Sequence, residues 1–341
     1  MRHFKTCILI LLSTGVFITC EDEKGITDYS GVYCINIQNM EMTIVQTGSE
    51  VSFTLQQELL VNGTGKIKED TLILTANTTG AETFTCHLTY SQDGQSFSGP
   101  YQITDMNGKT ASEGILMGYK GECPEYDIET REIPKFIDKD FMQLSKIEMI
   151  SKFRSGFGHS YTDGNETCRS MKHYYTPYKD FRKNNTVEIY SPVRGTIVSV
   201  LNDGYGESIG LKNKQVQIKP DDQQAFICAL FHCDLASSAL ATGRRVQAGE
   251  LLGYARLYYD DLAEYATSFD IAIWVNTPSG MRLISYFDTM MDAVFDSYVS
   301  RGAISRQDFI ITKEARDADP LQCNGESFVT DGNIDNWFIL Q

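Results

Sequence analysis

Short strand-like segments recur along most of this 341-residue chain, and they constrain its fold more than any other feature. Four segments in the first third are rich in β-branched and aromatic residues and partly alternate between apolar and polar positions: 42–46, 51–55, 71–75 and 83–90. Asn-Gly or Asp-Gly pairs, which favour tight turns, stand at 62–63, 93–94 and 107–108. Strands at this spacing predict an antiparallel β-barrel or β-sandwich over residues 20–125.

The second half of the chain is also predicted to be mainly β structure. Strand-like segments follow one another at residues 187–200, 215–219, 225–232 and 269–275. A helix is expected over residues 286–299, with Gly302 near its end. The sequence therefore predicts a mainly β protein with a few helices.

A different pattern separates the two halves. Between residues 133 and 153 the apolar side chains recur at roughly helical spacing, and Pro134 suits the first turn of a helix. Gly158 follows soon after and would stop it. We therefore predict a helical linker at residues 126–155, a second domain at 156–323 and an acidic tail at 324–341.

Charge and hydrophobicity exclude several classes of protein. Acidic residues outnumber basic ones by 45 to 30, which gives a formal net charge of −15. A chain this acidic is not expected to bind nucleic acid, because it lacks the positive charge needed to neutralise phosphates. Hydrophobic residues make up 42% of the chain, which is enough for a buried core. No second long apolar run follows the N-terminus, so a polytopic membrane protein is not expected.

The N-terminus resembles a bacterial lipoprotein signal. Basic residues at positions 2 and 5 precede an apolar run over 7–18, which is too short to be a comfortable membrane span. The run stops just before Cys20, and acidic residues follow at once. We expect residues 1–19 to be removed as a signal peptide and Cys20 to carry lipid, so that the protein is exported and anchored to a bacterial membrane. The alternative is an ordinary cleaved signal peptide without lipid.

Cysteine usage agrees with export. The chain has nine cysteines, of which Cys7 would leave with the signal peptide and Cys20 would be acylated. Seven remain: Cys34, Cys86, Cys123, Cys168, Cys228, Cys233 and Cys323. An odd number leaves at least one thiol without an internal partner, and the sequence does not fix the pairing. The chain has no C-x-x-C pair, so a zinc knuckle or a thioredoxin-like site is not expected.

Four residues of the second half stand out as candidates for chemistry. His159 and Asp163 are four residues apart, close enough to converge on one cation as mixed nitrogen and oxygen ligands. His232 ends an apolar strand-like run. Asp270 lies inside another apolar strand, where a charge is costly unless it is paired or bound to a metal.

The order of these pieces resembles the lysostaphin-type (LytM-like) zinc metallopeptidases, which cut peptide crosslinks of bacterial peptidoglycan. That family has H-x-G-x-D, a P-V strand pair, Y-x-H-L, a G-x-x-V-x-x-G-x-x-I-G turn and a final H-L-H. The matching stretch covers residues 156–275, and the turn at 243–253 is its most specific piece. The resemblance implies a LytM-like β domain of the duplicated hybrid type at residues 156–323.

The resemblance also implies roles for individual residues. His159, Asp163 and Asp270 match the three metal ligands, and zinc is the metal implied. His232 matches the catalytic histidine of Y-x-H-L. With a metal bound, His232 would assist proton transfer while the metal activated a water molecule.

Several positions depart from the family pattern. Tyr161 replaces the glycine of the first motif, Ser268 replaces a catalytic histidine, and Asp270 is a carboxylate where the family has an imidazole. A second carboxylate ligand would make the metal a poorer Lewis acid. These departures predict a degenerate active site.

Residues 168–173, Cys-Arg-Ser-Met-Lys-His, resemble a divergent set of LytM-like bacterial proteins that also carry Asp in the last strand. One interpretation places Lys172 or His173 in the cleft, with His173 as a second catalytic candidate in place of the missing histidine. The other makes His173 a packed strand residue. For Cys168 we favour one half of a disulfide.

Three functions remain open at this point. The chain is interpreted as an exported cell-envelope lipoprotein that acts on or binds peptidoglycan peptides, as a zinc metalloendopeptidase with a degenerate site. The alternative is a catalytically silent module that binds wall peptide or a partner hydrolase of the cell wall. A third interpretation is a surface lipoprotein whose N-terminal half binds a ligand.

Overall fold

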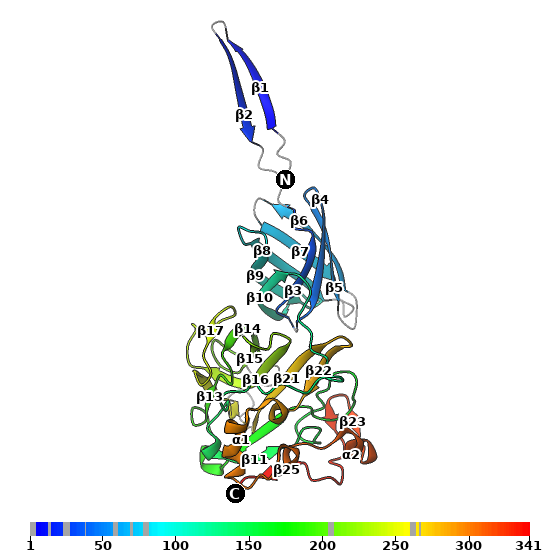
Figure 1. Cartoon of the computed structure of the whole chain (residues 1–341), viewed down its shortest axis with the longest axis vertical. Coiled ribbons are helices and arrows are strands. Elements are labelled where there is room, and N and C mark those ends of the chain that lie inside the picture. Colours follow the sequence, from blue (N-terminus) through cyan, green and yellow to red (C-terminus); the bar gives the residue numbers. More distant parts are fainter. Residues whose placement is uncertain are drawn as a thin grey trace.

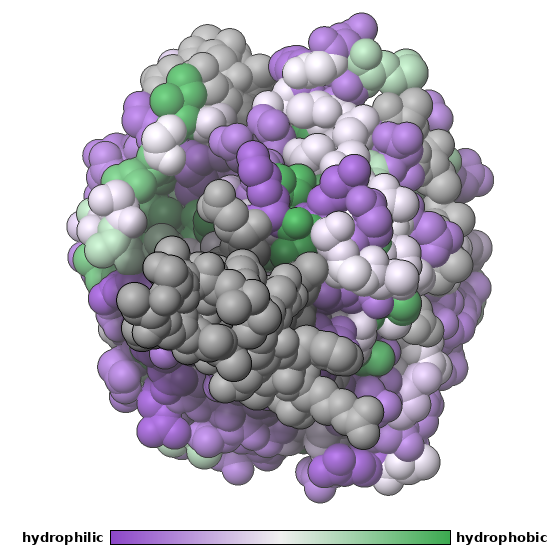
Figure 2. Space-filling view, turned by 90° about the horizontal axis from the view of Figure 1, so that it is seen from above, coloured by the Kyte–Doolittle hydropathy of each residue, from purple (hydrophilic) through white to green (hydrophobic). Residues whose placement is uncertain are grey.

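Two β domains follow one another along the chain (Figure 1). The computed structural model describes residues 5–12, 15–22, 28–37, 39–56, 61–68, 71–77, 82–203, 208–259, 264–265 and 267–341. The predicted fold class, a β-barrel or sandwich followed by a β domain with a few helices, is confirmed. Seen from above, the coloured surface is mostly hydrophilic, with small separate hydrophobic areas (Figure 2).

The first strands, β1 (Lys5–Leu12) and β2 (Gly15–Asp22), pair as an antiparallel hairpin. The predicted signal segment and Cys20 fall in this region, and residues 1–4 and 13–14 of the segment lie outside the described residues. Export and acylation therefore stay predictions. In the described part of the chain, no helix has both the length and the apolar character needed to span a membrane.

The N-terminal domain is a closed antiparallel barrel of eight strands, each paired with its neighbours in the chain, with β10 closing onto β3. The strands are β3 (Gly31–Ile35), β4 (Glu41–Thr47), β5 (Glu50–Gln56), β6 (Val61–Lys68), β7 (Thr71–Asn77), β8 (Thr83–Tyr90), β9 (Ser96–Thr104) and β10 (Thr110–Lys120). Full closure leaves the barrel without exposed strand edges.

Aromatic rings facing glycines fill part of the barrel. Gly118 pairs with Phe97 and Gly63 pairs with Phe53 on neighbouring strands. A Cβ atom added at either glycine would lie 2.2 Å from the ring opposite, so the missing side chain is what admits the ring. This explains why the turn predicted at residues 62–63 is wrong: both residues lie inside β6, where Gly63 packs under Phe53.

The C-terminal domain is built on one sheet of long and short strands. Its main strand order is β17-β14-β15-β16-β21-β12-β11-β25. Its strands are β11 (Ile147–Ser151), β12 (His173–Pro177), β13 (Glu188–Tyr190), β14 (Gly195–Asn202), β15 (Lys214–Pro220), β16 (Phe226–Leu235), β17 (Arg245–Val246), β18 (Leu251–Ala255), β21 (Phe269–Thr277), β22 (Gly280–Ile284) and β25 (Trp337–Ile339). Two short hairpins, β19 (Tyr258–Tyr259) with β20 (Glu264–Tyr265) and β23 (Cys323–Asn324) with β24 (Ser327–Phe328), complete the described strands.

The predicted helical linker at residues 126–155 is wrong. Its only regular elements are the 3-10 turn η1 (Leu144–Lys146) and β11. The backbone N–H groups of Phe136 and Ile137 donate to the carbonyl of Thr289, at 2.8 and 3.0 Å. Because the apolar side chains of this segment enter the domain core, tertiary hydrogen bonds replace the helical ones.

The predicted helix over residues 286–299 is confirmed in part. It divides into the 3-10 turn η3 (Tyr286–Thr289) and helix α1 (Asp292–Val299). Gly302 follows α1 with a φ of +96°, a backbone conformation that glycine adopts without steric cost. The remaining helices are the 3-10 turns η2 (Lys179–Phe181) and η4 (Arg306–Phe309) and the short α2 (Lys313–Ala318).

Two disulfides and one buried amide hold distant segments together. Cys34 pairs with Cys123, and Cys168 pairs with Cys323, as favoured for Cys168 from the sequence. Among the described residues, three cysteines are buried and unpaired: Cys86, Cys228 and Cys233. Asn36, in the barrel, donates to the carbonyls of Ile115 and of Val198 on β14, so its side chain joins the two domains.

Candidate functional site

A β-bulge positions His232 on β16. Lys214 of β15 pairs with Cys233 and Val216 pairs with Leu230, so one residue of β15 faces two residues of β16. His232 takes a φ of +56°, which is uncommon for a residue with a Cβ atom and costs about 1–3 kcal/mol. Bulges commonly redirect a side chain beside a functional site, and this one turns the imidazole toward Asp270 of the adjacent strand β21.

The imidazole of His232 lies between two carboxylates. Its Nε2 is 3.3 Å from Oδ1 of Asp270, and its Nδ1 is 3.4 Å from Oδ2 of Asp203. The same Nδ1 is 3.4 Å from Oδ1 of Asn213. The backbone N–H of His232 also donates to Asp203, at 3.1 Å. Both carboxylates are buried, so the strained strand position is held by several polar contacts at once.

The ammonium group of Lys172 completes the cluster. Its Nζ lies 2.8 Å from Oδ2 of Asp270 and 3.3 Å from Nε2 of His159. The ring centres of Phe231 and Tyr161 are 3.8 and 4.3 Å from the same nitrogen, within the range of cation–π interactions. The Lys172 side chain is almost fully buried. A positive charge that belongs to the chain therefore lies between a carboxylate and an imidazole.

The contact with Lys172 fixes the hydrogen position on His159. An ammonium group only donates hydrogen bonds, so Nε2 of His159 accepts and Nδ1 carries the proton of the neutral ring. Burial, followed by the positive charge of Lys172, lowers the pKa of His159. The ring is therefore neutral at pH 7. Its Nδ1 lies 3.6 Å from Oε2 of Glu326.

Asp163, the second predicted metal ligand, is engaged elsewhere. Its Oδ2 accepts from Nε of Arg282 and from the backbone N–H of Leu283, both at 3.0 Å. Its Oδ1 accepts from the backbone N–H of Asn165, also at 3.0 Å. These bonds tie the buried carboxylate to strand β22.

His173, the second predicted catalytic residue, is also engaged elsewhere. Its Nδ1 donates to the carbonyl of Ser151 and its Nε2 accepts from the Ser285 hydroxyl, both at 2.9 Å. Full burial lowers the pKa of His173 to about 4. The His173 ring packs beside Phe153 and Phe287, whereas Lys172, directly before β12, contacts Asp270, so the two neighbouring side chains enter different surroundings.

A zinc ion does not fit the residues as they are arranged. In the part of the chain that the structure describes, no three His, Cys, Asp or Glu side chains are grouped so that they could hold a metal. His159 and Asp270 instead share the Lys172 ammonium. A second cation about 4 Å from that ammonium would be repelled by about 4 kcal/mol per unit charge at an effective dielectric of 20.

The sequence identified most but not all of this cluster. Its members His159, His232, Asp270 and Lys172 were singled out as candidates, and the sheet brings them together. Asp203, Asn213 and Glu326 also contact the predicted residues, yet nothing in the sequence marks them. Their involvement depends on the bulge in β16 and on a hairpin near the C-terminus.

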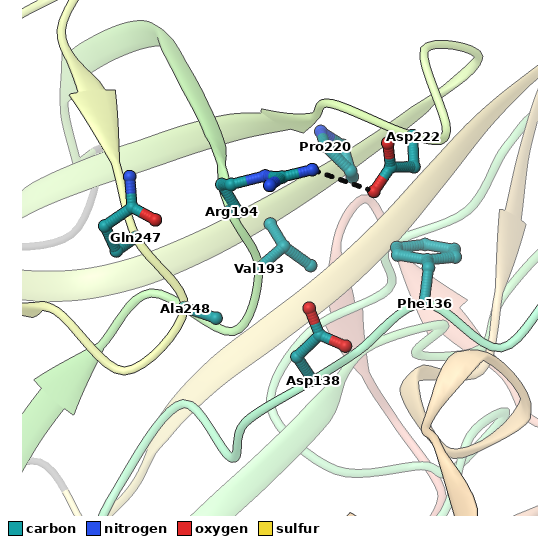
Figure 3. A pocket seen from close by; sticks show the side chains of 8 residues that line it. All are labelled: Phe136, Asp138, Val193, Arg194, Pro220, Asp222, Gln247 and Ala248. Carbon is teal, nitrogen blue, oxygen red and sulfur yellow. Dashed lines mark hydrogen bonds and ion pairs between the residues drawn. The ribbon is translucent and has the colours of Figure 1, made fainter.

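A separate pocket of about 330 Å³ lies away from this cluster (Figure 3). Asp138, Arg194 and Gln247 supply most of its polar lining. The Arg194 guanidinium already pairs with Asp221, at 3.1 Å, and with Asp222, at 3.3 Å. Because its charge is satisfied by these neighbours, the pocket has no group prepared for a ligand anion.

Comparisons with known proteins give a limited result. No family model matches the chain, and no curated protein matches it. Two crystal structures of Csd3 from Helicobacter pylori are similar to it, with TM-scores of 0.30 and 0.27 and identities of 10% and 12%. The alignments cover 74% and 77% of this chain and 76% and 80% of Csd3. The chain is thus similar to Csd3 only at a level too low to support an inference from that protein.

Proposed function

We propose that the C-terminal domain is a metal-independent binding module of the LytM-like type, which binds the peptide part of peptidoglycan in the bacterial envelope. One observation carries this proposal: the Lys172 ammonium lies between His159 and Asp270, where the resemblance implies a zinc ion. The ligand class comes from the resemblance of residues 156–275 to peptidases of cell-wall crosslinks.

The chemistry of an ammonium group favours binding over hydrolysis. A metal ion can accept a lone pair from water and lower its pKa, whereas an ammonium group has no vacant coordination position. The Lys172 nitrogen is surrounded by Asp270, His159 and two aromatic rings. The ammonium group therefore cannot activate a water molecule in the way that a zinc ion would.

The outer edge of the cluster suits a peptide ligand. The His159 side chain is 40% exposed, but its Nδ1 atom is buried 3.6 Å from the Glu326 carboxylate. The bond that Lys172 makes to the other ring nitrogen places the proton on Nδ1. The half-buried Tyr161 stacks edge-on against both His159 and Phe231. With the Glu326 side chain moved aside, this donor beside aromatic surface can bind an oxygen atom of a peptide and an adjacent apolar group.

Co-sedimentation with purified peptidoglycan tests this proposal. We expect the full chain to bind in the presence of a chelator. His159→Ala is expected to raise the dissociation constant about five-fold, as for the loss of one hydrogen bond of about 1 kcal/mol. His87→Ala, at an exposed position of barrel strand β8, is the matched control and is expected to bind normally. Binding that disappears with the chelator would contradict the proposal.

A zinc peptidase is the second candidate, and the geometry of His232 favours it. A strained imidazole held between two carboxylates is typical of a residue positioned for chemistry. This function requires Lys172 to leave Asp270 so that zinc can bind. Soluble peptides released from peptidoglycan with added zinc, and not released by His232→Ala, would support the peptidase and argue against the binding module.

A further inference from the structure

A hairpin near the C-terminus contacts the exposed edge of the cluster. Residues 325–326 form the turn between β23 and β24, with Gly325 at a φ of +60°. The backbone N–H of Ser160 donates to the carbonyl of Glu326 at 2.7 Å. The Glu326 carboxylate lies 3.6 Å from Nδ1 of His159. Glu326 thus accepts a hydrogen bond from Ser160 and covers the Nδ1 atom of His159, which is buried and has no hydrogen-bond partner of its own in the described structure.

The base of this hairpin is held more firmly than its tip. The Cys168–Cys323 disulfide ties the base to the segment that leads into Lys172. The N–H of Val329 donates to the carbonyl of Gln322 at 2.7 Å, which closes the hairpin below the turn. At the tip, the Glu326 side chain is 83% exposed and faces a neutral imidazole. One backbone hydrogen bond, worth about 1 kcal/mol, therefore joins the tip to Ser160.

We propose that Glu326 is a built-in competitor, which occupies the Ser160 donor and covers the His159 donor that a carboxylate-bearing peptide would use. This inference rests on the proposed function and names the ligand class: a peptide that offers a carbonyl to Ser160 and a carboxylate to His159. The hairpin tip leaves when such a ligand arrives, while the disulfide keeps the hairpin base in place. Ligands without a carboxylate gain nothing from displacing it.

The contact between the hairpin and the site can be tested in the absence of any ligand. Hydrogen exchange of the backbone amide of Ser160, followed by mass spectrometry, reports the bond to Glu326. We expect about three-fold faster exchange in Cys168→Ser/Cys323→Ser, because local opening of the hairpin becomes easier. Glu326→Ala keeps the backbone carbonyl that accepts from Ser160 and is expected to change the exchange little. The matched control is Cys34→Ser/Cys123→Ser, which removes the other disulfide and is expected to leave Ser160 exchange unchanged. Unchanged Ser160 exchange in Cys168→Ser/Cys323→Ser would overturn the proposal.

The competition itself is measured by calorimetry with a short synthetic peptide that carries free carboxylates, beside its fully amidated twin. We expect Glu326→Ala to bind the carboxylate peptide about five-fold more tightly than the unaltered chain, and the amidated twin to show no such gain. Glu314→Ala, at an exposed glutamate on α2, is the control and is expected to match the unaltered chain. Equal or weaker binding by Glu326→Ala would overturn the proposal.

The two measurements separate this inference from the function on which it rests. Faster Ser160 exchange in Cys168→Ser/Cys323→Ser, with no peptide or peptidoglycan bound by any form, would support the hairpin as a cover, and it would refute both the binding function and the ligand class. Peptidoglycan binding that is unaffected by Glu326→Ala would leave the proposed function standing and refute the competitor.

Discussion

Lys172 and Asp270 form a buried ion pair, and at the residue scale this pair determines what the cluster can do. The two side chains are 3% and 0% exposed. Removing one partner from such a pair leaves an uncompensated charge in the interior, whereas replacing both by apolar residues removes the cost of burying the charges as well. Each member of the pair is therefore needed for stability only while the other member is present.

This reasoning predicts how the loss of one member of the pair differs from the replacement of both. Lys172→Ala is expected to lower the free energy of unfolding by about 3–5 kcal/mol, because Asp270 remains buried without its cation. Lys172→Met combined with Asp270→Leu is expected to be clearly more stable than Lys172→Ala. Urea denaturation measures all three chains. A loss of less than about 1 kcal/mol in Lys172→Ala, as for an exposed pair, would contradict the prediction.

His173 makes the free energy of unfolding depend on pH. Burial lowers its pKa in the folded chain to about 4, below the ordinary value of 6.5. Between these two values the unfolded chain takes up a proton that the folded chain does not, so acid favours unfolding. The stability is present above pH 6.5 and is lost as the pH falls toward 4, by about 3 kcal/mol in total.

The measurement compares the unaltered chain with His173→Gln by urea denaturation from pH 7 to pH 4. The difference cancels titrating groups that both chains share. We expect the stability of the unaltered chain to fall more steeply than that of His173→Gln over this range. Parallel curves would show that His173 does not titrate as its buried position requires.

At the scale of the elements, glycine–aromatic pairs shape the barrel. Gly118 of β10 faces Phe97 of β9, and an added Cβ atom would lie 2.2 Å from the ring, which is 2% exposed. A buried ring in a packed barrel has little room to move, so extra volume causes strain. The glycine is therefore required by the ring and not by a turn.

Gly118→Ala tests this packing. We expect a loss of about 1–3 kcal/mol in the free energy of unfolding, from overpacking against Phe97. Adding Phe97→Leu in the same chain, which removes the clashing ring atoms, is expected to recover part of the loss. Thermal denaturation of the three chains decides the point. If the second substitution adds its own full cost, the ring is not the source of the strain.

The sequence predicted elements well where the pattern along a strand was sufficient. The alternation in residues 269–275 correctly predicts most of β21. Alternation of side chains arises within one strand, so it can be recognised without knowing the strand's partners. The segment at 133–153 has apolar residues at helical spacing, yet Phe136 and Ile137 bond to Thr289, far along the chain. Such a partner cannot be identified from local spacing.

The same limit applies to the candidate site. The resemblance pointed to His159, His232 and Asp270, and all three belong to the cluster. The direction of the Lys172 side chain and the contact of Glu326 depend on the register of β12 against β21 and on a disulfide between distant cysteines. Strand register and disulfide pairing join residues that are far apart in the chain, so they cannot be predicted from the spacing of nearby residues.

At the scale of the whole molecule, a hydrogen bond from Asn36 joins the two domains. The proposed place of action is the bacterial envelope. The apolar run that ends before Cys20 supports export and lipid anchoring. We expect Cys20→Ser to shift the protein from the membrane fraction to the soluble fraction, because it removes the acylated thiol. Membrane association in the same amount would show that lipid on Cys20 is not the anchor.

Calorimetric titration of the full chain with zinc tests most directly whether Lys172 takes the place of a metal. Because the ammonium already lies between His159 and Asp270, we expect no saturable binding of one zinc ion per chain. Asp270→Asn serves as the matched control, since it removes the carboxylate that a zinc ion at this site would need. Stoichiometric zinc binding by the unaltered chain, abolished by Asp270→Asn, would show that the ammonium yields to a metal and would contradict a metal-independent site.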